Sequence, residues 1–110
     1  MLARVLYSEA RCQSRYGKLA VAQVVLNRLE SSYYGNTLKE ILTAANQFAP
    51  LGGTSYGLRL LAYQALSGER FAEDYVLLYF RRTTSTSDWF APFLFHVGVH
   101  AFYGFPRHKD

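Results

Sequence analysis

The sequence predicts an α+β fold in which about four helices precede a small antiparallel β-hairpin. Apolar residues recur at helical spacing over the first two thirds of the chain. Two later segments are instead rich in β-branched and aromatic residues, as buried strands are. Because helices come first and strands last, the class is α+β. With 110 residues, half of them hydrophobic and 18% charged, residues 1–110 are predicted to form one globular domain.

The first helix is predicted over residues 2–11 and carries the most informative residue, Glu9. This glutamate lies four residues after Val5 and therefore on the apolar stripe of the helix. A carboxylate there must be paired, exposed at the wall of a cleft, or kept protonated by its surroundings. The last state is the one that a general acid needs, which makes Glu9 a candidate catalytic acid. The alternative is a glutamate at the edge of the stripe or bonded to an arginine of a neighbouring helix. The stripe consists of Leu2, Val5, Leu6 and Ala10.

A second helix is predicted over residues 17–31, with two adjacent apolar columns that indicate deep burial. Asn27 and Arg28 interrupt this hydrophobic pattern. Arg28 could pair with a carboxylate, Glu9 included, or it could belong to a solvated helix end.

Two further helices and a connecting loop are predicted between residues 37 and 68. Thr37 with Glu40 forms a capping-box pattern that opens a short helix ending near Ala45. Another helix is predicted over residues 55–66, stopped by Ser67-Gly68. Between them, Gln47 and Phe48 place an amide beside an aromatic ring in a turn-rich segment. That pair suits carbohydrate contact, and it equally suits a loop fastened to the core by its phenylalanine.

The two predicted strands cover residues 75–80 and 95–103 and are expected to pair with each other. A polar loop from Arg81 to Asp88 precedes the second strand. Asp88 is the best candidate for a second carboxylate, although a turn residue is the simpler interpretation. The neighbouring Trp89 could stack on sugar rings.

His96 and His100 are four residues apart and, with Glu9, could form a two-histidine, one-carboxylate metal site. The spacing is weak support, because strand-borne histidines are more often structural, and no metal or cofactor is predicted. Cys12 is the single cysteine, so an intrachain disulfide is excluded. It is interpreted as a small packing residue rather than a nucleophile.

A net charge of +4 favours polyanionic partners such as nucleic acid, membrane surfaces or an anionic cell wall. The basic residues are scattered, with Arg81-Arg82 as the only doublet, which argues against nucleic-acid binding. No apolar run is long enough for a membrane span, and no signal peptide is visible in this chain.

Taken together, six segments resemble the SleB/CwlJ-type cell wall hydrolases, the spore cortex-lytic family. They run in the family's order and spacing over nearly the whole chain. Cys12 stands where the family usually has glycine, Val99 where it often has a second glycine, and Arg81-Arg82 where Asn/Pro-like residues are common. The matching segments are LARVLYSEAR (2–11), VAQVVLNR (21–28), NTL (36–38), QFAP (47–50), LYF (78–80) and GVHAFY (98–103).

The resemblance implies a lysozyme-like catalytic domain that acts on peptidoglycan between N-acetylmuramic acid and N-acetylglucosamine, as a lytic transglycosylase or a muramidase. It implies that Glu9 is the single catalytic acid. It also implies that the chain is associated with the wall or the spore, where it would take part in cortex lysis during germination together with accessory proteins. A route with one carboxylate fits the residues, since substrate assistance by the 2-acetamido group is a recognised alternative to a second acid. The residues expected to contact the substrate are Gln47, Phe48, Trp89, His100, Tyr103 and Arg28.

Two other functions are compatible with these residues. A metal-dependent amidase would cut the peptide stem with His96, His100 and Glu9. A non-catalytic wall-binding module would keep the fold and use its aromatic residues for sugars.

Overall fold

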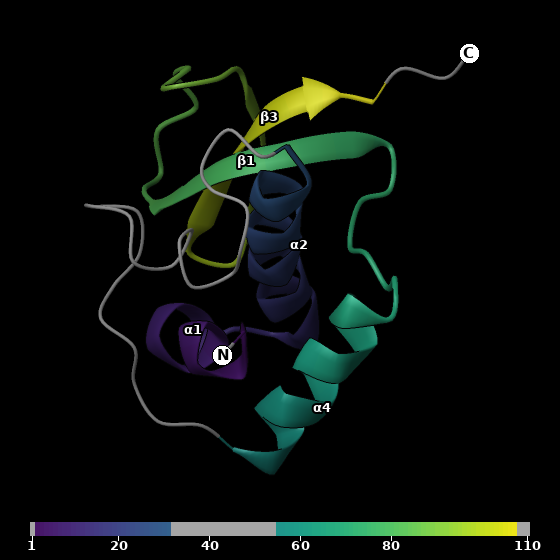
Figure 1. Cartoon of the computed structure of the whole chain (residues 1–110). Coiled ribbons are helices and arrows are strands. Elements are labelled where there is room, and N and C mark those ends of the chain that lie inside the picture. The colour runs from purple at the N-terminus through teal and green to yellow at the C-terminus, as the bar shows by residue number, and fades with distance from the viewer. Residues whose placement is uncertain (1, 32–54, 108–110) are drawn as a thin grey trace.

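The computed structural model describes residues 2–31 and 55–107, and within them three helices are followed by three strands. This order confirms the predicted α+β class. Figure 1 shows α2 running between the sheet at one end of the molecule and helices α1 and α4 at the other. The elements are α1 (Leu2–Ala10), α2 (Arg15–Ser31), α4 (Tyr56–Leu66), β1 (Tyr75–Arg82), β2 (Phe93–Val97) and β3 (His100–Pro106).

The three described helices begin and end within two residues of their predicted bounds. The hydroxyl of Ser55 accepts a hydrogen bond from the Leu58 N–H at 3.2 Å and caps α4. Gly68 follows the end of α4 with φ +114°, a conformation that favours glycine. The predicted short helix from Thr37 to Ala45 lies outside the described residues. None of the described helices is both long and apolar enough to cross a bilayer.

The predicted hairpin is wrong in one respect, because the sheet has three strands in the order β1-β3-β2. The segment predicted as one strand over residues 95–103 is broken at Gly98-Val99, and Val97 pairs with His100 across this two-residue turn. Gly98 has φ +59°, so a glycine at the first turn position permits the reversal. The strand β1 also continues through Arg81 and Arg82, which were predicted to lie in a loop.

The two faces of the sheet pack against different parts of the chain. Phe102 lies on the face toward the helices and belongs to the main core, with Phe80 beside it at a ring distance of 6.0 Å. Tyr103 and Ala101 lie on the outer face in a smaller cluster with Ala91. Ala91 comes from the segment 83–92, which therefore covers the outer face.

The central helix α2 is buried over most of its length, including the polar residues Gln23, Asn27 and Arg28. The amide of Gln23 donates to the carbonyl oxygens of Ala72 and Tyr75 at 2.7 and 3.1 Å, and its oxygen accepts from the Ala72 N–H at 2.9 Å. Asn27 donates to the Leu77 carbonyl at 3.0 Å. Because β1 is an edge strand, these side chains supply hydrogen-bond partners that a neighbouring strand would otherwise provide.

Candidate functional site

Glu9 lies in the last turn of α1, at the boundary between the core and a cavity. Val5 and Leu6 are fully buried on the same helix, as the apolar stripe predicted. The Glu9 side chain is half-buried and lines a cavity of about 180 Å³. The cavity is lined by Ser8, Glu9, Ala10, Arg11, Cys12, Gln13 and Arg82.

The connection between α1 and α2 is a tight turn that forms one wall of this cavity. The Gln13 N–H donates to the Ala10 carbonyl at 2.9 Å, which closes the turn after α1. The Ser14 hydroxyl accepts from the Gly17 N–H at 3.2 Å and caps the start of α2. Cys12 is exposed within this turn, so its interpretation as a packing residue is wrong.

Gln13 also fastens this connection to the sheet. Its side-chain oxygen accepts a hydrogen bond from the Val99 N–H at 3.2 Å, across 86 residues of sequence. A Cβ atom at Gly98 would overlap that same oxygen. The β2–β3 turn is therefore held against the segment that carries the Glu9 cavity, and glycine is required at Gly98 for this approach as well as for its φ.

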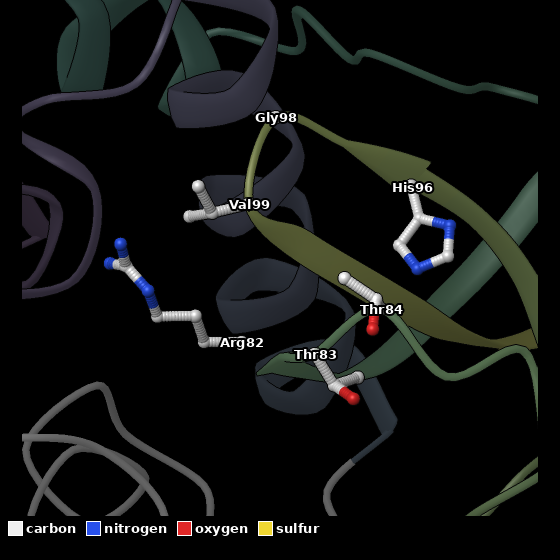
Figure 2. A pocket seen from close by; sticks show the side chains of 6 residues that line it. All are labelled: Arg82, Thr83, Thr84, His96, Gly98 and Val99. Atoms are coloured by element: carbon white, nitrogen blue, oxygen red, sulfur yellow. The ribbon is translucent and has the colours of Figure 1, made fainter.

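A larger cavity of about 540 Å³ lies at the end of the sheet (Figure 2). In Figure 2, the His96 ring and the Thr84 side chain lie close together, whereas Arg82 and Val99 extend toward the other side. Arg82 lines both this cavity and the Glu9 cavity, so the two adjoin at its side chain. The larger cavity is lined by Arg82, Thr83, Thr84, His96, Gly98 and Val99.

His100 lies under this end of the sheet rather than on an open surface. It pairs with Arg82 in the β1–β3 register, is 4% exposed, and packs edge-on against Phe80 at a ring distance of 5.1 Å. Its Nδ1 is buried and makes no hydrogen bond within the described part of the chain. Burial, with the positive charge of Arg82 as a smaller contribution, lowers the pKa of His100 below its usual 6.5. The imidazole is therefore neutral at pH 7.

Trp89 and Tyr103 form a stack on the outer face of the sheet. Trp89 is 41% exposed and lies 5.5 Å from the fully buried Tyr103 ring. The guanidinium of Arg81 lies 4.7 Å from the Trp89 ring centre, and its Nε donates to the Tyr103 hydroxyl at 2.7 Å. Because Tyr103 is fully buried, it can contribute to sugar binding only by supporting the Trp89 ring above it. Neither Tyr103 nor Trp89 lines the two cavities described above.

Arg28 does not lie at a solvated helix end, so that alternative is wrong. Its side chain is buried at 3% exposure, its Nε donates to the Leu78 carbonyl at 2.6 Å, and its guanidinium lies 5.0 Å from the Tyr79 ring centre. Leu78 is the extra residue at an irregularity in the β1–β3 register. Arg28 thus joins α2 to the irregular part of β1.

Other predicted residues are placed as follows. Gln47 and Phe48 lie outside the described residues. The Asp88 carboxylate accepts a hydrogen bond from the Phe93 N–H at 2.8 Å, as a turn residue does.

His96 and His100 lie on opposite faces of the sheet, because His96 pairs with Ala101, the neighbour of His100. Within residues 2–31 and 55–107, no three His, Cys, Asp or Glu side chains gather in a way that could hold a metal ion.

Sequence reasoning missed Gln13 and gave Arg82 no role. The signal for Arg82 was present, since Arg81-Arg82 is the only basic doublet and directly follows a strand pattern. Nothing local marks Gln13, because its partner Val99 is distant in sequence. The resulting arrangement places one half-buried carboxylate in a cavity that Arg82 also lines, next to a wider cavity lined by hydroxyl and imidazole groups. Such a set can move a proton on an elongated polar ligand.

Comparison with known proteins gives a consistent result. A model of the cell wall hydrolase family matches residues 12–103. The spore cortex-lytic enzyme of Bacillus subtilis is 30% identical over 115 residues, which cover 93% of this chain and 36% of the relative. The spore cortex-lytic enzyme of Oceanobacillus iheyensis is 29% identical, with coverages of 93% and 40%. The chain therefore spans well under half the length of these relatives.

Two solved structures share the fold. The catalytic domain of the germination-specific lytic transglycosylase SleB from Bacillus anthracis is similar with a TM-score of 0.75 and 25% identity, covering 93% of this chain and 89% of that one. The catalytic domain of the Bacillus cereus SleB protein has a TM-score of 0.78 and 23% identity, with coverages of 93% and 85%. Both likenesses extend over nearly all of this chain.

Proposed function

The chain belongs to the cell wall hydrolase family, and from this membership we propose that it is a catalytic domain that cleaves the glycan strands of peptidoglycan. The bond cut lies between N-acetylmuramic acid and N-acetylglucosamine. The observation that carries the proposal is the half-buried Glu9 at the end of α1, lining a cavity that adjoins a larger one at Arg82. Cleavage in the spore cortex during germination fits the relatives, which are named spore cortex-lytic enzymes.

The proposed reaction uses a single carboxylate. Among the described residues that line the two cavities, Glu9 is the one acid, and Asp88 is engaged by the Phe93 N–H. Glu9 donates its proton to the glycosidic oxygen while the substrate's 2-acetamido group stabilises the developing cation. The Glu9 carboxylate then takes a proton either from the muramoyl 6-hydroxyl, which gives a lytic transglycosylase, or from water, which gives a muramidase.

The remaining predicted residues have supporting parts in this proposal. Trp89 offers a partly exposed ring for stacking on sugar. His100, Tyr103 and Arg28 are buried, so they act by holding Arg82, Trp89 and β1 in place. Gln47 and Phe48 remain proposed sugar contacts on sequence grounds alone. The domain would meet its substrate in the wall or the spore, with or without accessory proteins.

The test is digestion of purified peptidoglycan by the wild type and by Glu9→Gln, with the released fragments weighed by mass spectrometry. The variant should lose about 10²–10⁴-fold in rate, the usual contribution of a positioned acid. The matched control is Glu73→Gln, which removes an exposed carboxylate that lines neither cavity. Near-full activity of Glu9→Gln would overturn the assignment.

The masses of the wild-type products also identify the reaction. Fragments one water lighter than hydrolysed disaccharides indicate a transglycosylase, and full-mass disaccharides indicate a muramidase. Free stem peptides would instead favour the amidase. Binding to sacculi without any released fragment would leave the wall-binding module.

A further inference from the structure

Trp89 and Phe90 form an exposed aromatic pair directly after a run of polar residues, from Thr83 to Asp88. Trp89 is 41% exposed and Phe90 70% exposed, and their ring centres lie 4.6 Å apart. Phe90 also contacts Tyr79 at a ring distance of 5.5 Å. Two adjoining rings differ from the scattered single apolar residues that are ordinary on protein surfaces, and covering them with a ligand is favourable.

The chain holds this pair in a defined position. The Asp88 carboxylate accepts the Phe93 N–H at 2.8 Å on one side of the pair, and the Trp89 N–H donates to the Ala91 carbonyl at 3.1 Å on the other. Ala91 is buried at 6% exposure and anchors the segment on the sheet. A surface fixed in this way loses little conformational freedom when a ligand binds.

The Trp89–Phe90 pair lies away from the proposed point of cleavage. Trp89 rests on Tyr103, which belongs to the outer face of the sheet, whereas Glu9 belongs to a helix that packs on the inner side. In Figure 1 the green segment between β1 and β2 lies at the opposite end of the view from α1. Neither ring lines the Glu9 cavity or the larger one. A ligand on the pair is therefore outside both cavities.

The surroundings of the pair favour an uncharged sugar over other ligands. Two charges of opposite sign lie beside it, since the Arg81 guanidinium is 4.7 Å from the Trp89 ring centre and the exposed Asp88 directly precedes Trp89. Single-stranded nucleic acid would need a continuous basic groove, and a protein partner would need roughly 800 Å² of surface. Two rings near the exposed hydroxyl residues Thr86 and Ser87 instead suit a pyranose, which has an apolar face and polar edges.

We propose that Phe90 and Trp89 form a second glycan-binding site, on the outer side of the sheet and separate from the Glu9 cavity. It takes uncharged N-acetylglucosamine units of a wall strand, with Phe90 as the main stacking ring because it is the more exposed of the two. The inference rests on the proposed function for the identity of the glycan. Such a site holds the domain on the wall independently of the bond that Glu9 cleaves.

The test measures binding of a soluble oligomer of N-acetylglucosamine, which lacks the muramoyl bond proposed for cleavage. Calorimetry is carried out with Glu9→Gln as the background. Adding Phe90→Leu keeps an apolar side chain but removes the flat ring, and we expect it to weaken binding about tenfold. Adding Phe90→Tyr keeps the ring and should retain the affinity. The matched control is Tyr63→Leu on α4, which removes an equally exposed ring, at 69%, that lines neither cavity.

The single cysteine provides a way to test that the two sites are separate. Cys12 is exposed and lines the Glu9 cavity, so a bulky maleimide attached to it obstructs that cavity alone. The labelled protein should bind the oligomer with unchanged affinity. Loss of binding on labelling would place the oligomer in the Glu9 cavity and would overturn the inference.

Four other results would also overturn it. They are no binding of the oligomer, equal affinities with and without Phe90→Leu, the same loss in Phe90→Tyr or Tyr63→Leu, and tighter Phe90-dependent binding of a single-stranded oligonucleotide. Digestion of peptidoglycan by the wild type separates the two proposals. Cleavage without Phe90-dependent binding removes only this inference, whereas Phe90-dependent binding without cleavage removes only the proposed function.

Discussion

His100 and Arg82 face each other across β1 and β3, and this pairing explains why a histidine can be buried so deeply at a polar cavity. Phe80 and Phe102 surround the ring edge-on at 5.1 and 6.2 Å, so its surroundings are aromatic rather than ionic. Protonation would place a second cation beside Arg82 in an apolar site. The neutral imidazole is accordingly the form that the folded protein accepts.

The pH dependence of unfolding tests this arrangement. The pKa of His100 is lowered on folding, so between the folded value and 6.5 the unfolded chain binds more protons than the folded one. The free energy of unfolding should therefore fall as the pH drops below 6.5, with a slope from this group of at most about 1.4 kcal/mol per pH unit. Urea unfolding between pH 5 and pH 8 measures the slope.

His100→Phe should remove this part of the slope, whatever its effect on stability at pH 8. The matched variant His96→Phe retains His100 and should retain the slope. An identical pH profile for the wild type and His100→Phe would show that the buried imidazole is not the group responsible.

Individual site residues were predictable where the signal is local. Glu9 was placed correctly on the apolar stripe of α1 because helical spacing alone determines which residues share a face. Arg28 was misjudged because its acceptor, the Leu78 carbonyl, belongs to an irregular strand 50 residues later. Arg82 acquires its position only when α1, β1 and the β2–β3 turn meet, which no sequence window contains.

The interaction between α2 and β1 is the main link between the helices and the sheet. Gln23, Asn27 and Arg28 all bond to backbone groups of residues 72–78. A helix this deeply buried would ordinarily be apolar throughout. Its polar residues are explained by the carbonyl groups of an edge strand, which need donors.

Gln23→Leu should destabilise the fold by about 2 kcal/mol, because three hydrogen bonds to the partly buried segment 72–75 would be lost. The Ala72 carbonyl would keep its second partner, the Tyr75 N–H. Denaturant unfolding measures the loss as a lower midpoint at unchanged slope. The control Glu30→Leu changes an exposed residue of the same helix and should shift stability by less than about 0.5 kcal/mol. Equal stabilities of the wild type and Gln23→Leu would mean that these hydrogen bonds contribute nothing net.

The elements themselves were largely predictable, except where one glycine changes the topology. Helical periodicity determined α1, α2 and α4, and aromatic and β-branched residues determined β1. From Phe95 to Tyr103 the segment is rich in aromatic and β-branched residues, with Gly98 as its single glycine and no proline, so it indicated one strand. The reversal depends on Gly98 and on the Gln13 oxygen packed against it, and the latter contact is invisible in the sequence.

For the molecule as a whole, the net charge of +4 should draw the domain toward an anionic wall. The screening length is roughly 30 Å at 0.01 M salt, comparable with the longest dimension of 34 Å, so the full charge acts at a distance. At about 0.1 M salt it falls to about 10 Å and only local charges matter.

Binding of Glu9→Gln to purified sacculi should therefore weaken by about tenfold between these two salt concentrations, as sedimentation with the wall would measure. Sacculi with amidated carboxylates serve as the control and should show a smaller change. Salt-independent binding to native sacculi would show that contacts other than net charge determine the association.

Trp89 is the only tryptophan of the chain, and it lies in the segment that runs from Thr83 and Thr84 to β2. Its half-exposed ring is in contact with the Arg81 guanidinium and the Tyr103 ring. The protein thus contains a built-in optical reporter, since all of its indole fluorescence comes from one position. A glycan that stacks on this ring or displaces Arg81 would change the emission of the unlabelled protein, and binding could be followed in real time without any added dye.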